Sequence, residues 1–227
     1  MNATRPLGEV VDAAGAGDSG PIWQLATELS GAIPTPVRRE YMVTFDSAGI
    51  SATGPFIDGV ISVDGVHAGP VARRFYRDDQ AKLVVSNYAL MLEPWAQRHG
   101  FATAFARRME DYYRRSGVDR IVVHATDTIG GYAWAVQGFD WNPDRIDDSI
   151  ANVVQRLNTV ANQVHSQLAR RALAEMTVRL VGGRGEVRPF GRLPTPDEIA
   201  ALTTEDVPDL GKRVMLSSDW HGVKYLR

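Results

Sequence analysis

The chain has 227 residues, of which 44% are hydrophobic and 23% charged, with a formal net charge of −2 and no cysteine. This composition is typical of a soluble globular protein, and the small net charge provides no field that would attract nucleic acid. The lack of cysteine excludes disulfides, thiolate catalysis and cysteine–metal sites. Because no apolar run is long enough to cross a membrane and the N-terminus has no secretion signal, we expect no membrane partner and a cytoplasmic protein.

The N-terminal half contains one helix and then a run of strands. Residues 1–20 are rich in alanine, glycine and aspartate, so we expect a flexible N-terminus. A short helix is predicted over 22–33, and Pro34 and Pro36 end it. From 41 to 92 apolar residues alternate with other residues, which predicts antiparallel strands. Within this region Asp64-Gly65 is typical of a two-residue hairpin turn.

The strand that ends near Leu92 leads through a glycine-containing turn into a helix with an apolar stripe that begins at Phe101. The first turn of a helix presents backbone N–H groups that have no intrahelical partner, and the helix dipole favours an anion there. Gly100 would allow a bulky group to approach the backbone, and Ala102 keeps the surface low. The turn is therefore a candidate site for a pyrophosphate or another anion.

The spacing Gln97-x-x-Gly100-x-Ala102 resembles the acyl-CoA-binding signature of the GNAT N-acyltransferases. The resemblance covers roughly residues 56–141. It implies a mixed α/β (α+β) fold, in which a mostly antiparallel sheet contains a splayed parallel strand pair and carries helices on both faces. The GNAT-like core would occupy residues 21–141.

A second landmark of that family is an aromatic residue shortly before a Gly-Phe pair, and here Trp134 precedes Gly138-Phe139. In many members this aromatic residue is a tyrosine whose hydroxyl protonates the leaving thiolate, and an indole N–H is too weakly acidic to replace it. Tyr132 stands two positions away, which is about 200° around a helix. We therefore expect Tyr132 to act as the acid only if the two glycines before it break the helix.

The resemblance also implies which residues hold acetyl-CoA or another acyl-CoA. Main-chain groups of Leu90, Met91 and Leu92 would pair with the pantetheine amides. Backbone N–H groups of the following turn would hold the pyrophosphate, and two of its side chains could reach the CoA phosphates. The residues of this turn are Gln97, Arg98, His99, Gly100, Phe101 and Ala102. Asp127, at the end of the next strand, is a further candidate for a cofactor contact, or simply a helix cap.

Candidates for proton transfer are few. Glu93 ends the first of the two strands, His124 lies on the second, and Tyr132 follows. The alternatives are a solvated carboxylate for Glu93 and a hydrogen-bonded histidine beside the core for His124. The remaining histidines have no histidine partner at i, i+4, so we expect no metal site. They are His67, His99, His165 and His221.

Residues 142–227 extend beyond a minimal GNAT protein. Apolar residues three or four positions apart predict one long helix over 146–174, which packs on the sheet or pairs with a second copy or a protein partner. A last strand near 214–216 and the tail 220–226 would return to the sheet edge. The segment 46–55 is too short for the two helices that form part of the acceptor site in the family.

Two functions remain open from the sequence. The first is an acyl-CoA-dependent N-acyltransferase whose amine acceptor is unidentified and could belong to a protein or another macromolecule. The second is an inactive GNAT-fold module that binds a CoA-like ligand or a protein partner. A third interpretation, an α+β protein unrelated to the family, is distinguished by strand order. The GNAT interpretation requires the strands that end at Leu92 and Ala125 to be parallel neighbours.

Overall fold

A computed structural model describes residues 5–182 and 192–226, apart from the side chains of residues 127–129. It divides into two compact units, residues 1–122 with 225–227 and residues 123–224. The division falls within a strand at 122/123, whereas the sequence analysis ended the core at 141.

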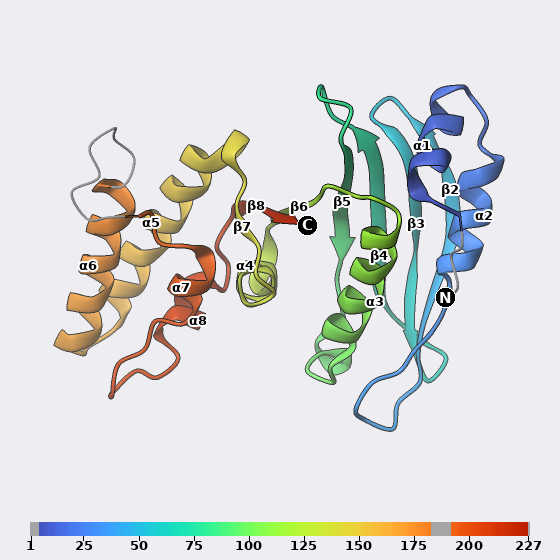
Figure 1. The fold of residues 1–227 in the computed structure, drawn as a ribbon. Coiled ribbons are helices and arrows are strands. Elements are labelled where there is room, and N and C mark those ends of the chain that lie inside the picture. Colours follow the sequence, from blue (N-terminus) through green and yellow to red (C-terminus); the bar gives the residue numbers. More distant parts are fainter. Residues whose placement is uncertain (1–4, 183–191, 227) are drawn as a thin grey trace. The chain divides into compact units, whose positions relative to one another are not determined.

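The first unit contains an antiparallel meander in which each strand pairs with the next, as the sequence predicted (Figure 1). Its strands are β1 (Gly31–Ile33), β2 (Tyr41–Ser51), β3 (Gly54–Val63), β4 (Val66–Arg77) and β5 (Leu83–Leu90). In β2 the buried residues Tyr41, Val43 and Phe45 alternate with more exposed ones, because successive side chains of a strand point to opposite faces. Asp64 and Gly65 form the predicted turn, with left-handed φ angles of 52° and 80°.

Three helices accompany this meander. They are α1 (Leu7–Gly15), α2 (Gly20–Leu29) and α3 (Phe101–Arg115). The expectation of a flexible segment over 1–20 is wrong for α1, which buries Leu7 and Val10 and is joined to β4 by a bidentate ion pair. In this pair Arg77 donates to both carboxylate oxygens of Asp12, at 2.7 and 2.9 Å. Apolar burial that the alanine- and glycine-rich composition concealed therefore orders the segment.

Strand β6 (Arg120–Ala125) passes from the first unit into the second. At its start, the N–H of Asp119 donates to the carbonyl of Leu83 (2.9 Å), and Arg120 forms an ion pair with Asp78 (2.6 Å). The beginnings of β5 and β6 thus lie side by side, and α3 connects the end of one strand to the start of the other. This is the parallel pair that the sequence analysis predicted.

The second unit combines short strands with helices. In it β6 neighbours β8 (Trp220–Tyr225), and β8 pairs antiparallel with β7 (Asp140–Trp141). The tail strand therefore lies between two strands and not at the sheet edge. The helices are α4 (Asp127–Val136), α5 (Ile146–Gln163), α6 (Gln167–Gly182), α7 (Pro196–Ala200) and α8 (Leu210–Met215). The strand expected near 214–216 is wrong, since Val214 and Met215 belong to α8.

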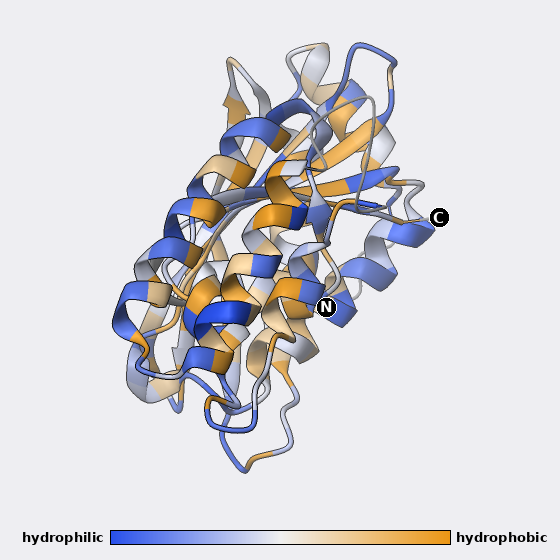
Figure 2. Cartoon of the chain, turned by 90° about the vertical axis from the view of Figure 1, so that its left-hand side faces the viewer, coloured by the Kyte–Doolittle hydropathy of each residue, from blue (hydrophilic) through white to orange (hydrophobic). Residues whose placement is uncertain are grey.

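The single helix expected over 146–174 is also wrong, because the chain breaks between α5 and α6. Val164 is extended, with φ −86° and ψ 137°, and the hydroxyl of Ser166 accepts the N–H of Ala169. Ser166 thus caps a new helix. The helices carry both hydrophilic and hydrophobic residues, as expected of helices with one buried and one exposed face (Figure 2). No described helix is long and apolar enough to cross a membrane.

Candidate functional site

The end of β5 departs from regular pairing. Two residues of β5, Asn87 and Tyr88, stand opposite the single residue Arg73 of β4, which is a β-bulge. The Arg73 guanidinium is buried and donates to the carbonyls of Ala72 (2.7 Å) and Ala89 (2.8 Å). A buried charge held by backbone carbonyls on both strands fixes the position of the bulge.

Beyond the bulge the chain continues along β4. The N–H groups of Met91 and Glu93 donate to the carbonyls of Pro70 (3.2 Å) and Ala68 (2.8 Å). Because backbone groups alternate along an extended chain, the N–H of Leu92 points away from β4. The predicted pseudo-strand over Leu90, Met91 and Leu92 is thus extended and presents a main-chain donor on its outer edge.

The predicted anion turn then leads into α3. The Gln97 side chain closes the turn by donating to the carbonyl of Leu92 (2.7 Å). Arg98 and Gly100 have left-handed φ angles of 66° and 81°. The first N–H groups of α3, beginning with Phe101, have no partner within the helix, and the N-cap residue Gly100 has no side chain to accept them. The local geometry of an anion-binding helix start is therefore present.

One expectation about this turn needs correction. A Cβ atom built on Gly100 would lie 2.9 Å from Cδ of Pro36, so the loop after β1 already occupies the space that we assigned to a ligand. Glycine is required at position 100 because the backbone there is left-handed and because Pro36 leaves no room for a Cβ atom. Ala102 follows Gly100 by two residues and is half-buried. Its small side chain leaves the helix start accessible, as the sequence suggested.

A histidine of the turn is held by a buried tyrosine. The Tyr41 hydroxyl lies 2.7 Å from the carbonyl oxygen of Ala96 and 2.8 Å from Nδ1 of His99. The hydroxyl has one proton, and only donation can satisfy a carbonyl, so His99 must donate from Nδ1. In its neutral form His99 therefore has a lone pair on Nε2 that is available to another group.

Cationic side chains flank the turn. Arg98 is exposed, and the guanidinium of Arg39 lies 5.8 Å from the ring centroid of Trp95, over its face. Arg39 also lies 3.7 Å from Asp64, so part of its charge is compensated. The sequence analysis missed Arg39 because the loop that carries it lies far from the motif along the chain.

Glu93 follows this pseudo-strand and is exposed. Within the described residues its carboxylate takes part in no ion pair. Glu93 thus stays the first candidate for the base by its position after the pseudo-strand.

The other candidates lie in the second unit. His124 is exposed, and its Nε2 atom lies 2.9 Å from a carboxylate oxygen of Asp219. Its ring stacks on that of His221, with centroids 4.0 Å apart and planes at 7°. Burial lowers the pKa of His221, and the neighbouring His124 lowers it further. The sequence analysis treated His124 as a candidate base and expected no metal site at His221, and the fold brings the two histidines together.

Helix α4 carries Tyr132 and Trp134, and it runs without a break through the two glycines before Tyr132. Tyr132 is half-buried, with Nζ of Lys212 at 5.6 Å from its ring centroid. Trp134 is 8% exposed and packs edge-on against Phe139, so it is a core residue. The side chain of Asp127, the remaining cofactor candidate, lies outside the described residues.

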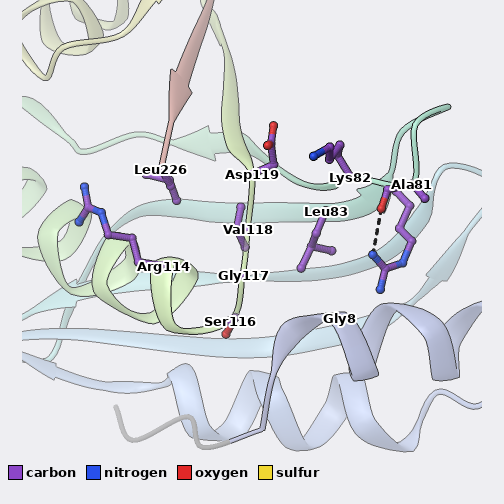
Figure 3. Close-up of a pocket in the computed structure, with 11 residues that line it drawn as sticks. Gly8, Ala81, Lys82, Leu83, Arg114, Ser116, Gly117, Val118, Asp119 and Leu226 are labelled. Carbon is purple, nitrogen blue, oxygen red and sulfur yellow. Dashed lines mark hydrogen bonds between the residues drawn. The ribbon is translucent and has the colours of Figure 1, made fainter.

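An open cavity of about 480 Å³ lies in the first unit near the start of β5, and so not at the turn that follows β5 (Figure 3). Arg77, Lys82 and Arg114 contribute to its lining. Asp12 compensates Arg77, and two acidic residues of α3 compensate Arg114. The carboxyl end of α3 also borders the cavity, and its carbonyl groups disfavour anions. This cavity is therefore not the predicted phosphate site.

No protein-family model matches the chain, and no curated protein does. Solved structures match part of it. Naa50 of Arabidopsis thaliana, in complex with a bisubstrate analogue, is 13% identical over 37% of this chain and 58% of its own, with a TM-score of 0.33. N-acetylglutamate synthase of Neisseria gonorrhoeae, complexed with coenzyme A and L-arginine, is 22% identical over 37% of this chain and 19% of its own, with a TM-score of 0.31.

An aminoglycoside acetyltransferase from an uncultured soil metagenomic sample, in complex with sisomicin, is 19% identical over 36% of this chain and 54% of its own, with a TM-score of 0.30. The chain thus spans less than two thirds of each of these proteins. The similarity covers little more than a third of the chain.

Proposed function

We propose that the chain is an acyl-CoA-dependent N-acyltransferase that transfers an acetyl or other acyl group to an unidentified amine. The observation that carries the proposal is the backbone between β5 and α3. An outward N–H at Leu92 is followed, after a short turn, by the uncapped start of a helix. A main-chain edge suits an amide-containing chain, and a helix start suits a pyrophosphate. Acyl-CoA contains both groups in that order.

The proposed reaction joins the amine nitrogen to the thioester carbon and breaks the carbon–sulfur bond. The amine loses a proton to a base, and the thiolate receives one. Glu93 is the first candidate for the base, because it is exposed at the end of the pseudo-strand. His124 is the second candidate. The acid stays unassigned. Trp134 is buried against Phe139 and has no acidic proton, and α4 is not broken before Tyr132, which was the condition for Tyr132 to act as the acid.

One observation favours the alternative, a module that binds a CoA-like ligand or a protein partner without transfer. The aromatic residue at the usual acid position is a core tryptophan. Helix α6 also exposes Leu168, Val178 and Val181, so a contact with a second copy or a protein partner stays a proposal for this helix and not for one long helix over 146–174. The cytoplasmic location likewise stays a prediction.

Calorimetric titration with CoA, acetyl-CoA and pantetheine tests the site. Ala102→Glu places a carboxylate at the helix start, where it competes with a pyrophosphate and does not disturb the helix. Ala106→Glu, one turn later on α3, is the matched control, because both alanines are half-buried. We expect CoA to bind the wild type and the control, and the Ala102→Glu variant to lose at least tenfold in affinity. Pantetheine, which lacks the pyrophosphate, should bind both variants equally.

Failure of CoA and acetyl-CoA to bind the wild-type chain would overturn the cofactor assignment. Binding that the Ala102→Glu variant retains in full would overturn the position of the site. If CoA binds as expected, incubation with acetyl-CoA and a panel of amines then separates the two functions. Release of free thiol that depends on the amine supports the transferase, and its absence supports the binding module.

A further inference from the structure

The second unit contains a cluster of three metal-ligating side chains, His124, Asp219 and His221. Each offers one ligand atom, and these atoms all lie within 4.8 Å of one another. His124 and Asp219 are hydrogen-bonded at 2.9 Å. That contact alone would explain two members of the cluster. It does not explain why a second imidazole stacks on the first at 4.0 Å.

The fold determines that the three side chains share one place. His124 lies on β6 and His221 on the neighbouring strand β8. Paired positions on adjacent strands bring side chains to about 5 Å of each other on one face. Asp219 precedes His221 by two positions, which returns an extended chain to the same face. The backbone of the two neighbouring strands therefore brings the three groups together.

Both backbone polar groups of His221 are hydrogen-bonded. Its N–H donates to the hydroxyl of Ser149 (2.9 Å), and its carbonyl accepts the N–H of Asn142 (2.9 Å). Ser149 is fully buried and donates in turn to the carbonyl of Arg145 (2.7 Å). A preformed position for one ligand reduces the entropy that is lost when an ion binds.

The charges around the cluster permit a cation. Arg145 is close enough to influence His221, but its guanidinium forms an ion pair with Asp148 at 3.2 Å. The side chains of His124 and Asp219 are 50% and 52% exposed, so an ion can reach them and they are free to rotate toward it.

We propose that His124, Asp219 and His221 bind a divalent first-row transition-metal ion of the Zn²⁺ class. Two imidazole nitrogens and one carboxylate oxygen suit Zn²⁺, Co²⁺ or Ni²⁺. Mg²⁺ and Ca²⁺ require mainly oxygen ligands and do not fit this set. Three protein ligands leave at least one coordination position open to water or to another ligand. This proposal does not depend on the binding of acyl-CoA in the first unit.

Titration of the full chain, freed of any affinity tag, with Zn²⁺ alone tests the proposal. We expect one ion per chain with micromolar or tighter affinity, and a rise in melting temperature with Zn²⁺ concentration. Co²⁺ should give visible absorption bands typical of low coordination number. Mg²⁺ should produce neither effect.

The variants His221→Ala and Asp219→Asn should each weaken Zn²⁺ binding at least tenfold. The matched controls are His67→Ala and His165→Ala, which remove exposed histidines outside the cluster and should leave the affinity unchanged. Circular dichroism shows whether each variant is folded. Absence of saturable Zn²⁺ binding, or equal affinity in the wild type and the Asp219→Asn variant, would overturn the proposal and leave His124 and Asp219 as a hydrogen-bonded pair.

Discussion

Nδ1 of His99 lies 2.8 Å from the hydroxyl oxygen of Tyr41, which connects the predicted anion turn to the buried face of β2. The Tyr41 ring also stacks on Phe101, the first residue of α3, at 4.9 Å. The position of the turn is thus set by the core and not only by the local sequence of the motif.

The Tyr41→Phe variant should lose stability and ligand affinity together. It removes the hydroxyl that bonds both Ala96 and His99, which should lower the free energy of unfolding by about 1–3 kcal/mol because buried groups lose their partner. CoA affinity should fall as His99 becomes free to rotate. Urea unfolding and calorimetry measure the two effects. Tyr112→Phe, which removes a hydroxyl bonded to the Arg5 carbonyl at 3.1 Å, is the control and should change stability alone.

Replacing Gly69 should displace the pseudo-strand. Gly69 has a φ of 144°, and a Cβ atom there would lie 2.2 Å from the carbonyl oxygen of Met91. Gly69→Ala should therefore lower the free energy of unfolding by at least about 2 kcal/mol and weaken CoA binding. Gly65→Ala is the comparison, because its left-handed turn position has no atom within 4 Å of a new Cβ. It should cost about 1–2 kcal/mol and leave binding unchanged. Equal losses of affinity in both variants would contradict this assignment.

Alkaline pH should destabilise the chain through two tyrosines. Burial raises the pKa of Tyr112 and of Tyr113 to about 12. The folded-state pKa therefore exceeds the ordinary value of about 10, so the unfolded chain releases these protons first and stability falls as pH rises from about 10 to about 12. Each tyrosine should contribute about 1.4 kcal/mol to the loss at about pH 11.

Urea unfolding midpoints measured near neutral pH and at about pH 11 give this loss. The loss in the Tyr113→Phe variant should be smaller by about 1.4 kcal/mol, since its own titrating group is removed. Tyr41, whose pKa burial also raises, still contributes to the loss. If the variant and the wild type lost stability in parallel over this range, Tyr113 would not be the source.

The two candidate bases predict different kinetics. If Glu93 is the base, Glu93→Gln should lower kcat by at least about a hundredfold while CoA affinity stays the same. His124→Gln should then have little effect on kcat. The reverse result would assign the base to His124. In that case added Zn²⁺ should inhibit the reaction, because a metal-bound imidazole cannot accept a proton.

The sequence predicted local features well where local chemistry determines them. The turn at Asp64 and Gly65 follows from residue type. The role of Gly100 was misassigned, because its contact with Pro36 joins segments that lie far apart in the sequence. The break between α5 and α6 was not predicted, because the apolar spacing continues through Val164 and only the cap at Ser166 reveals a new helix. The cluster of His124, Asp219 and His221 could not be predicted, since His124 and Asp219 are 95 positions apart and strand order alone brings them together.

The contact between Leu226 and Asp119 has a consequence for synthesis. The N–H of Leu226 donates to the carbonyl of Asp119 at 3.0 Å, so residues near the carboxyl end complete a unit that begins near the amino end. Roughly a hundred residues must be translated between the two, which takes about 5–20 s at typical rates. During that interval the backbone at Asp119 lacks its final hydrogen-bond donor. This hydrogen bond of the first unit therefore forms only after the residues of the second unit have been translated.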